Sequence, residues 1–186
     1  VEQGITTGMT QTTFQPNGIC NRGQVATFLW RSAGEANPIE GANPFKDVKA
    51  KQYYYTAVLW AVEQGITTGY TDGTFRPAAS CTRGQIATFL WRANRSPELA
   101  TKNPFSDVAE GPFYQAILWA VEKGITTGLS PNTFSPNSPC TRGQIATFLW
   151  RANGSPAPQS SYNPFRDVYA GPFYKAILWA VENGIT

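Results

Sequence analysis

A repeat of about 60 residues constrains the fold of this chain more than any other feature. The phrase VEQGITTG of residues 62–69 is also found at 1–8, returns as VEKGITTG at 121–128, and ends the chain as VENGIT at 181–186. A fourteen-residue phrase, CTRGQIATFLWRAN, stands at 81–94 and again at 140–153, with a looser copy at 20–33. Self-similarity at a fixed period is typical of folds built from one supersecondary unit used repeatedly.

The unit between residues 103 and 153 predicts two helices joined by a turn-rich connection. The first helix is predicted within 111–124, with Pro112 in its first turn and Gly124 after its last turn. Its apolar face follows the spacing i, i+3, i+4, i+7 of Tyr114, Ile117, Leu118 and Val121. The second helix covers 141–153 and turns Ile145, Phe148 and Leu149 inward.

Each second helix is expected to begin at a capping box, in which a side chain at the helix start and a Gln three residues later satisfy each other's backbone N–H groups. The pairs are Asn21 with Gln24, Thr82 with Gln85, and Thr141 with Gln144. A glycine follows the first helical residue in all three copies, at 23, 84 and 143. Since glycine costs a helix up to about 1 kcal/mol relative to alanine, we expect a close approach there, such as that of another backbone.

Helices of about 12 residues are marginal alone, so the three pairs are predicted to share one core. The predicted fold is mainly α: three helix-loop-helix repeats in a pseudo-threefold bundle forming one domain over residues 1–186. Its parts are a second half-repeat at 1–34, repeats at 43–95 and 103–154, and a first half-repeat at 163–186. The last helix, Phe173–Val181, either packs on the N-terminal segment of its own chain or docks on the next chain in a head-to-tail homopolymer.

Composition narrows the classes of function. The chain contains no histidine, and a net charge of +3 with scattered basic residues does not indicate nucleic-acid binding. No apolar run approaches the roughly 20 residues that would cross a membrane. A carboxylate pair drawn from Asp47, Asp107 and Asp167 is conceivable, but each aspartate better suits a turn or a cap before the first helix. We therefore predict no catalysis and no cofactor.

One cysteine precedes each second helix, at positions 20, 81 and 140. The spacing is unlike that of paired metal ligands. Buried thiols are the favoured interpretation, with an intermolecular disulfide or a metal site as alternatives.

Several spaced motifs together resemble the S-layer homology domain. NPFKDV, YYYTAVLWA, GITTGYTDGTFRP and CTRGQIATFLWR occur in the order of the family's unit, and the likeness covers nearly the whole chain. The resemblance implies a three-repeat pseudo-threefold bundle at the bacterial cell surface or cell wall. It also implies a non-covalent anchor whose grooves hold a pyruvylated secondary cell-wall polysaccharide.

The resemblance also assigns candidate ligand-binding residues. They are the arginines Arg22, Arg83 and Arg142, the glycines Gly8, Gly69 and Gly128, and Asp72 of the one surviving Asp-Gly turn. Gln11 and Pro131 stand where the other two copies would carry Asp, so the middle groove is the best candidate. A guanidinium fork suits a sugar carboxylate.

Alternative roles stay open for these residues and for the chain. The arginines could instead pair with Glu2, Glu63, Glu122 and Glu182 near the ends of the first helices. Trp60, Trp119 and Trp179 suit core packing more than sugar stacking, whereas Trp30, Trp91 and Trp150 are expected to be more exposed, where they could stack on sugar or meet a partner chain. The whole chain suits either a glycan anchor or a structural repeat that assembles into an extracellular fibre or surface layer.

Overall fold

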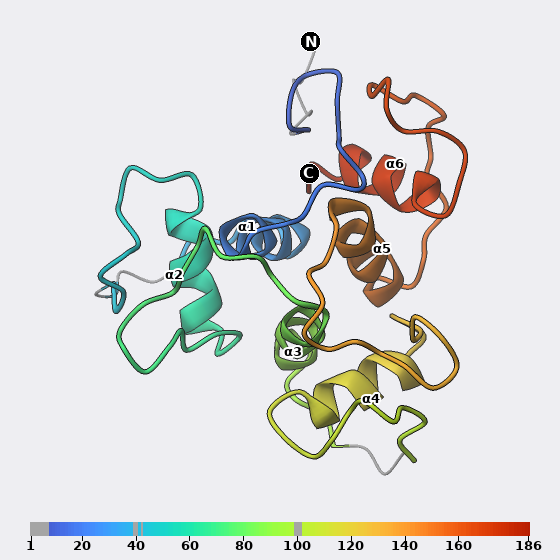
Figure 1. Ribbon diagram of the computed structural model, residues 1–186. Helices are drawn as coiled ribbons and strands as arrows, with labels where there is room; N and C mark the ends of the chain where they lie inside the picture. The colour runs from blue at the N-terminus through green and yellow to red at the C-terminus, as the bar shows by residue number, and fades with distance from the viewer. Residues whose placement is uncertain (1–7, 39–40, 42, 99–101) are drawn as a thin grey trace.

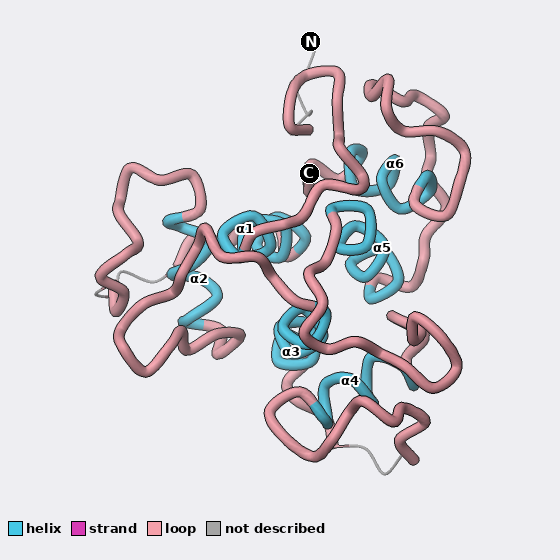
Figure 2. The backbone as a smooth tube through the Cα atoms, viewed as in Figure 1, coloured by secondary structure: helices cyan, strands magenta, loops and turns pink. Residues whose placement is uncertain are grey.

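The computed structural model describes residues 8–38, 41, 43–98 and 102–186. The described residues form six helices: α1 (Arg22–Ser32), α2 (Tyr55–Glu63), α3 (Arg83–Ala93), α4 (Tyr114–Glu122), α5 (Arg142–Ala152) and α6 (Tyr174–Glu182). Loops and turns make up most of the remaining chain (Figure 2). Within the described ranges, no helix has the length and apolarity needed to cross a membrane.

The helices surround a pseudo-threefold axis in two tiers, with α1, α3 and α5 near the centre and α2, α4 and α6 outside them (Figure 1). The close pairs are α1 with α2, α3 with α4, and α5 with α6. Each pair thus joins the second helix of one sequence repeat to the first helix of the next, across the polar linker. The packing unit is therefore offset by half from the sequence unit.

The inner helices begin as predicted. Asn21, Thr82 and Thr141 each accept a hydrogen bond from the backbone N–H three residues on, and the Gln side chain reaches back in all three boxes. The outer helices are nine residues long, shorter than the predicted 12, and they have no side-chain cap. Pro112 lies in the turn before α4 rather than inside its first turn, while Gly124 is left-handed (φ +66°) after the helix, as expected.

One core is shared by all three helix pairs, as the marginal length of the helices required. Its members recur in threefold sets, among them Leu29, Leu90 and Leu149 from the inner helices and Trp60, Trp119 and Trp179 from the outer ones. Burying each such side chain contributes about 1.5–3 kcal/mol to the free energy of unfolding, and a single helix pair could not bury these side chains without its neighbours. Smaller clusters under the first and third outer helices extend this core.

A closed ring of backbone hydrogen bonds joins the three cysteines at the axis. The N–H of Cys20 donates to the carbonyl of Cys140 (3.0 Å), Cys81 donates to Cys20 (2.9 Å), and Cys140 donates to Cys81 (2.9 Å). All three thiols are free and buried, which confirms the prediction of buried thiols over a disulfide. Burial raises the pKa of the Cys20 and Cys140 thiols from 9.0 to about 12, and that of Cys81 also rises.

The third lobe is completed by the N-terminal segment of the same chain. Asp167, which precedes α6, accepts hydrogen bonds from the backbone N–H groups of Phe14 (2.8 Å) and Gln15 (2.7 Å). The Phe14 and Phe165 rings pack 5.4 Å apart. The chain therefore closes on itself, the first of the two predicted outcomes for its last helix.

The aspartates of the NPF-x-D motif lie in turns before the outer helices, the first of the two predicted roles, and do not cap those helices. Asp47 accepts from the N–H groups of Phe75 and Arg76, and Asp107 accepts from those of Phe134 and Ser135. Asp167 does the same for the third lobe. The motif instead fastens each outer lobe to the loop that leads to the next inner helix.

Candidate functional site

A groove of about 290 Å³ opens between α1, α3 and the loop that follows α2. The loop contributes Thr67, Thr68 and Tyr70, while Gln85 and Arg92 come from α3. Phe89 of α3 and Phe113, just before α4, give it apolar walls. Hydroxyl, amide and guanidinium groups beside aromatic walls suit a ligand that carries hydroxyl groups and an anionic group.

Arg22, the first residue of α1, lies at the inner end of this groove. Its side chain is about 4% exposed, and its Nε donates to the carbonyl of Phe75 at 2.8 Å. The guanidinium stacks 4.6 Å from the centre of the Phe75 ring and 5.5 Å from that of Phe89. Burial lowers the pKa of Arg22, and the nearby Tyr70 is the largest influence that opposes this shift.

The other two arginines occupy equivalent positions. Arg83 Nε donates to the carbonyl of Phe134 (2.8 Å), and Arg142 Nε donates to that of Phe14 (2.7 Å). Each side chain is about 3% exposed, and burial lowers both pKa values. The sequence pairs each glycine-rich loop with the arginine that follows it, but the structure pairs the loop with the arginine of the preceding inner helix.

Ion pairs in the described part of the chain join Arg31 to Glu35 and Arg76 to Asp72, so the alternative in which Arg22, Arg83 and Arg142 pair with Glu63, Glu122 and Glu182 is not observed there. Glu2 lies outside the described residues. Glu182 accepts instead from the backbone N–H groups of Gln159 (3.0 Å) and Ser160 (2.6 Å). The three arginines therefore hold backbone carbonyls. This is a structural role that fixes the loop of each groove.

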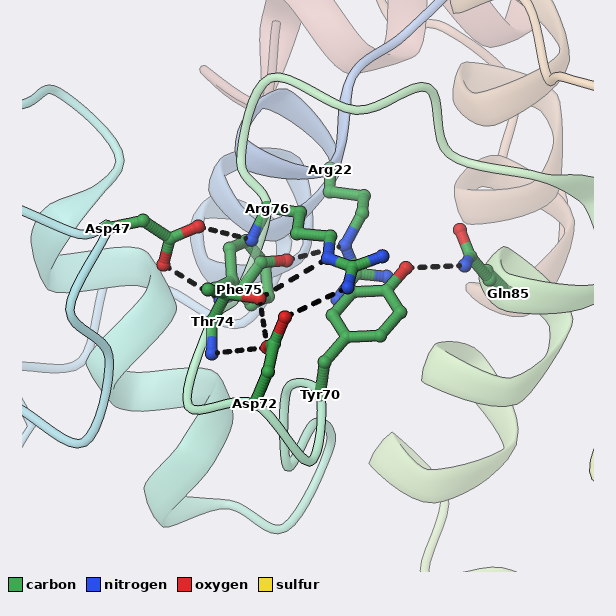
Figure 3. A network of polar contacts seen from close by, with 8 residues as sticks. All are labelled: Arg22, Asp47, Tyr70, Asp72, Thr74, Phe75, Arg76 and Gln85. Carbon is green, nitrogen blue, oxygen red and sulfur yellow. Dashed lines mark hydrogen bonds and ion pairs between the residues drawn. The ribbon is translucent and has the colours of Figure 1, made fainter.

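Tyr70 and Asp72 organise the outer rim of the groove (Figure 3). The Tyr70 hydroxyl lies 3.4 Å from the Gln85 amide nitrogen, which donates to it. The Arg76 guanidinium lies over the Tyr70 ring at 4.0 Å and donates to Asp72 at 3.0 Å. Hydrogen bonds from Thr74 and Arg76 lower the pKa of Asp72 to about 2. Asp72 thus shapes the turn and does not itself line the groove.

Gly69 is required by packing whether or not a ligand binds. It has φ +69°, and a Cβ there would lie 2.2 Å from Phe45 Cε1 and 2.7 Å from the carbonyl oxygen of Thr74. Gly8 and Gly128 share this close approach, to Phe165 and Phe105 respectively. Of the seven candidates that the resemblance assigned, only Arg22 and Gly69 line the groove of about 290 Å³.

The six tryptophans fall into a buried set and a partly exposed set. Trp60, Trp119 and Trp179 are buried to 7% exposure or less, as core packing predicted. The other three are more exposed, as expected, but their indole N–H groups donate to linker carbonyls: Trp30 to Ala36, Trp91 to Pro97 and Trp150 to Pro156. They therefore hold the linkers against the inner helices.

The sequence analysis missed Tyr70 and Gln85 as groove residues. Gln85 was assigned only to its capping box, although its amide serves both the helix start and Tyr70. The position of Tyr70 carries Met9 and Leu129 in the other copies, so its variation among near-identical repeats was the available signal. The described residues contain no group of three or more acidic, cysteine or histidine side chains suited to a metal.

Residues 1–26, 44–87 and 104–146 match the family model described as the S-layer homology domain. The chain is 33% identical over 135 residues to an S-layer protein of Bacillus thuringiensis subsp. finitimus, a match covering 67% of this chain and 16% of the relative. It is 28% identical to a cellulosome-anchoring protein of Acetivibrio thermocellus, covering 75% of this chain and 33% of that protein. It is also 34% identical to an endoglucanase of Bacillus sp. (strain KSM-635), over 65% of this chain and 13% of the enzyme. The chain thus spans a third or less of each of these relatives.

Proposed function

Because the chain belongs to the S-layer homology domain family, we propose that it is a non-catalytic module that anchors a surface protein to the bacterial cell wall. The S-layer and cellulosome-anchoring relatives support a location at the cell surface. The match to the endoglucanase covers only 13% of that enzyme, in keeping with a module carried beside other domains.

We propose that the groove beside Tyr70 binds an anionic cell-wall polysaccharide, of which a pyruvylated secondary polymer is the expected form. The observation that carries this proposal is the convergence of Arg22, Arg92 and Gln85 with the aromatic walls. A ketal carboxylate would take hydrogen bonds from guanidinium and amide groups, and the sugar's C–H surface would pack on Phe89 and Phe113.

The equivalent positions beside α1 and α5 are expected to bind this polymer more weakly. Met9 and Leu129 stand where the groove has Tyr70, so no phenol hydroxyl is available to the Gln24 or Gln144 amide. In the case of Met9, Gln24 approaches the thioether sulfur at 3.7 Å instead. We therefore assign the main site to the Tyr70 groove.

Assembly into a fibre through the two end segments is the second candidate function. The surface that the last lobe would offer to another chain already holds residues 12–15 of its own chain, through Asp167 and Arg166. Intramolecular closure thus favours the anchor over head-to-tail docking.

Tyr70→Leu tests the anchor without disturbing the buried arginines. Leu already stands at the equivalent position 129, so the fold should persist when the variant removes the phenol and the ring over which Arg76 lies. We expect it to lose most binding in a pull-down on purified sacculi, while Tyr162→Leu, which removes an exposed tyrosine outside the groove, retains it. Binding by the unaltered chain should also vanish when the wall polysaccharide is extracted. Equal binding by Tyr70→Leu and the unaltered chain would refute the groove assignment.

A further inference from the structure

A second cavity, which we name the axial pocket, lies where the C-terminal ends of all three inner helices converge. Its volume is about 410 Å³, within the usual range of small-molecule sites. Leu29, Leu90 and Leu149 form an apolar floor, one from each inner helix. The cavity therefore lies between the three inner helices, at the opposite end of these helices from the cysteine ring, which precedes their first residues.

The wall of the axial pocket is polar and positively charged. Gln64, Asn94 and Asn153 line it, together with Arg92 and Arg95. None of the described lining residues is acidic. Arg92 is held in place because its Nη1 donates to the carbonyl of Ile66, 3.3 Å away.

Helix C-termini carry partial negative charge, which would disfavour an anion. Here the terminal carbonyls are already engaged. In α3, the backbone N–H groups of Asn94, Arg95 and Ser96 donate to the carbonyls of the last turn, and the Asn94 amide donates to Leu90. The same backbone pattern closes α1 and α5. The two arginines therefore give the described lining of the pocket a net positive charge.

Arg95 is the residue that singles out this pocket. It has a left-handed backbone (φ +64°), whereas the equivalent residues of the other two copies are Gly34 (φ +84°) and Gly154 (φ +82°). A side chain at such a position is disfavoured relative to glycine and often accompanies a functional site. The chain thus places an arginine in the lining of the axial pocket at a position where its other two repeats have glycine.

We propose that the axial pocket binds an anionic sugar, about one hexose with a phosphate or carboxylate group. The oxyanion pairs with Arg92 and Arg95, because guanidinium groups present paired donors that match either acid. The sugar hydroxyl groups bond to the amides of Asn94, Asn153 and Gln64, and the C–H face of the ring rests on the leucine floor. This site does not depend on the polysaccharide groove, although Arg92 lines both.

Isothermal titration calorimetry with glucose 6-phosphate, glucuronate and glucose tests the proposal. We expect saturable binding of one or both anionic sugars with a Kd of about 1 mM or tighter, and at least tenfold weaker binding of glucose. The two anionic probes distinguish a phosphate site from a carboxylate site. Absence of saturable binding by both anions would overturn the proposal, as would equal affinity for uncharged glucose.

Arg95→Gly is the decisive variant, because it removes the guanidinium and restores the residue of the other two repeats. The fold should persist, with a melting temperature equal to or above that of the unaltered chain. We expect affinity for the anionic sugar to fall at least tenfold, while Arg166→Ala, which removes an exposed charge outside the pocket, leaves it unchanged. Unchanged affinity in Arg95→Gly, or loss of affinity in Tyr70→Leu alone, would place the ligand elsewhere and refute the proposal. Failure of sacculus binding would bear only on the groove.

Discussion

Replacing Gly143 by alanine sets helix propensity against packing. Gly143 is the second residue of α5, where alanine would stabilise an isolated helix by up to about 1 kcal/mol. A Cβ at this position would lie 2.6 Å from Cδ2 and 2.7 Å from Cγ of Phe173, a half-buried ring that packs against the core cluster of the third lobe. The predicted close approach is thus confirmed here, but the partner is an aromatic ring rather than a backbone.

The clash should outweigh the gain in propensity. Forcing one extra carbon into a packed site costs about 1–3 kcal/mol, and the ring cannot swing away because α5 and α6 pack along this seam. We expect Gly143→Ala to lower the free energy of unfolding by about 1–2 kcal/mol in urea denaturation followed by circular dichroism. For a chain of this size, each kcal/mol lowers Tm by about 2–4 °C.

Two further variants isolate the cause. Gly111→Ala serves as a control, since its Cβ would meet nothing closer than the Ala109 carbonyl oxygen at 3.9 Å, and it should leave stability unchanged or slightly higher. Combining Gly143→Ala with Phe173→Leu should cost less than the sum of the single changes, because the smaller side chain relieves the clash. A more stable Gly143→Ala variant would show that propensity governs this position and would refute the packing argument.

Three other perturbations test the closure, the axis and the arginines. Asp167→Asn should lower the free energy of unfolding by about 1–2 kcal/mol, because it weakens the two charge-assisted hydrogen bonds to the backbone of Phe14 and Gln15. Limited proteolysis should then cut the N-terminal segment faster than in the unaltered chain. Equal cleavage rates would contradict the closure. Burial raises the pKa of Cys20 and Cys140 from 9.0 to about 12, so the stability that these protonated thiols contribute is complete below pH 9 and is lost as pH rises toward 12. The free energy of unfolding should therefore decline between pH 9 and pH 12. At pH 8, alkylation of these thiols by iodoacetamide should require unfolding. Arg83→Lys should destabilise the fold by about 2–4 kcal/mol, because a lysine cannot reproduce the hydrogen bonds from Nε to the Phe134 carbonyl and from Nη2 to the Thr127 carbonyl. Full stability together with loss of sacculus binding would show that Arg83 binds the ligand instead.

The cysteines and arginines of the repeated phrase have structural roles that do not depend on a ligand. The backbone carbonyl of each cysteine accepts a hydrogen bond from the cysteine of the next unit around the axis. Each arginine donates to a backbone carbonyl in the loop of a neighbouring lobe. Arg142 shows the limit of this pattern, because its Nη2 is buried with no hydrogen-bond partner in the described part of the structure. Substitution of these arginines would therefore alter folding together with binding, whereas Tyr70 and Arg95 can each be replaced by a residue that another repeat already carries.

Local signals in the sequence were sufficient for the helices and for their need to share a core. The capping boxes at Asn21, Thr82 and Thr141 depend on residues three positions apart, so the letters alone locate each inner helix. The short helices likewise required that three pairs pool their apolar faces, since none could bury enough surface alone. The motif order was enough to suggest the family.

Relations between units were decided only in three dimensions. Nothing local indicates that α1 pairs with α2 across a linker, that Asp167 holds Phe14 from the far end of the chain, or that Arg22 serves the loop containing Tyr70. The axial pocket is likewise assembled from three repeats, and Arg95 joins Arg92 in its lining only because the ends of the inner helices meet there. Because the copies are nearly identical, each helix or loop has several equivalent candidates for its neighbour, and only the packing of the three lobes around the axis selects one of them.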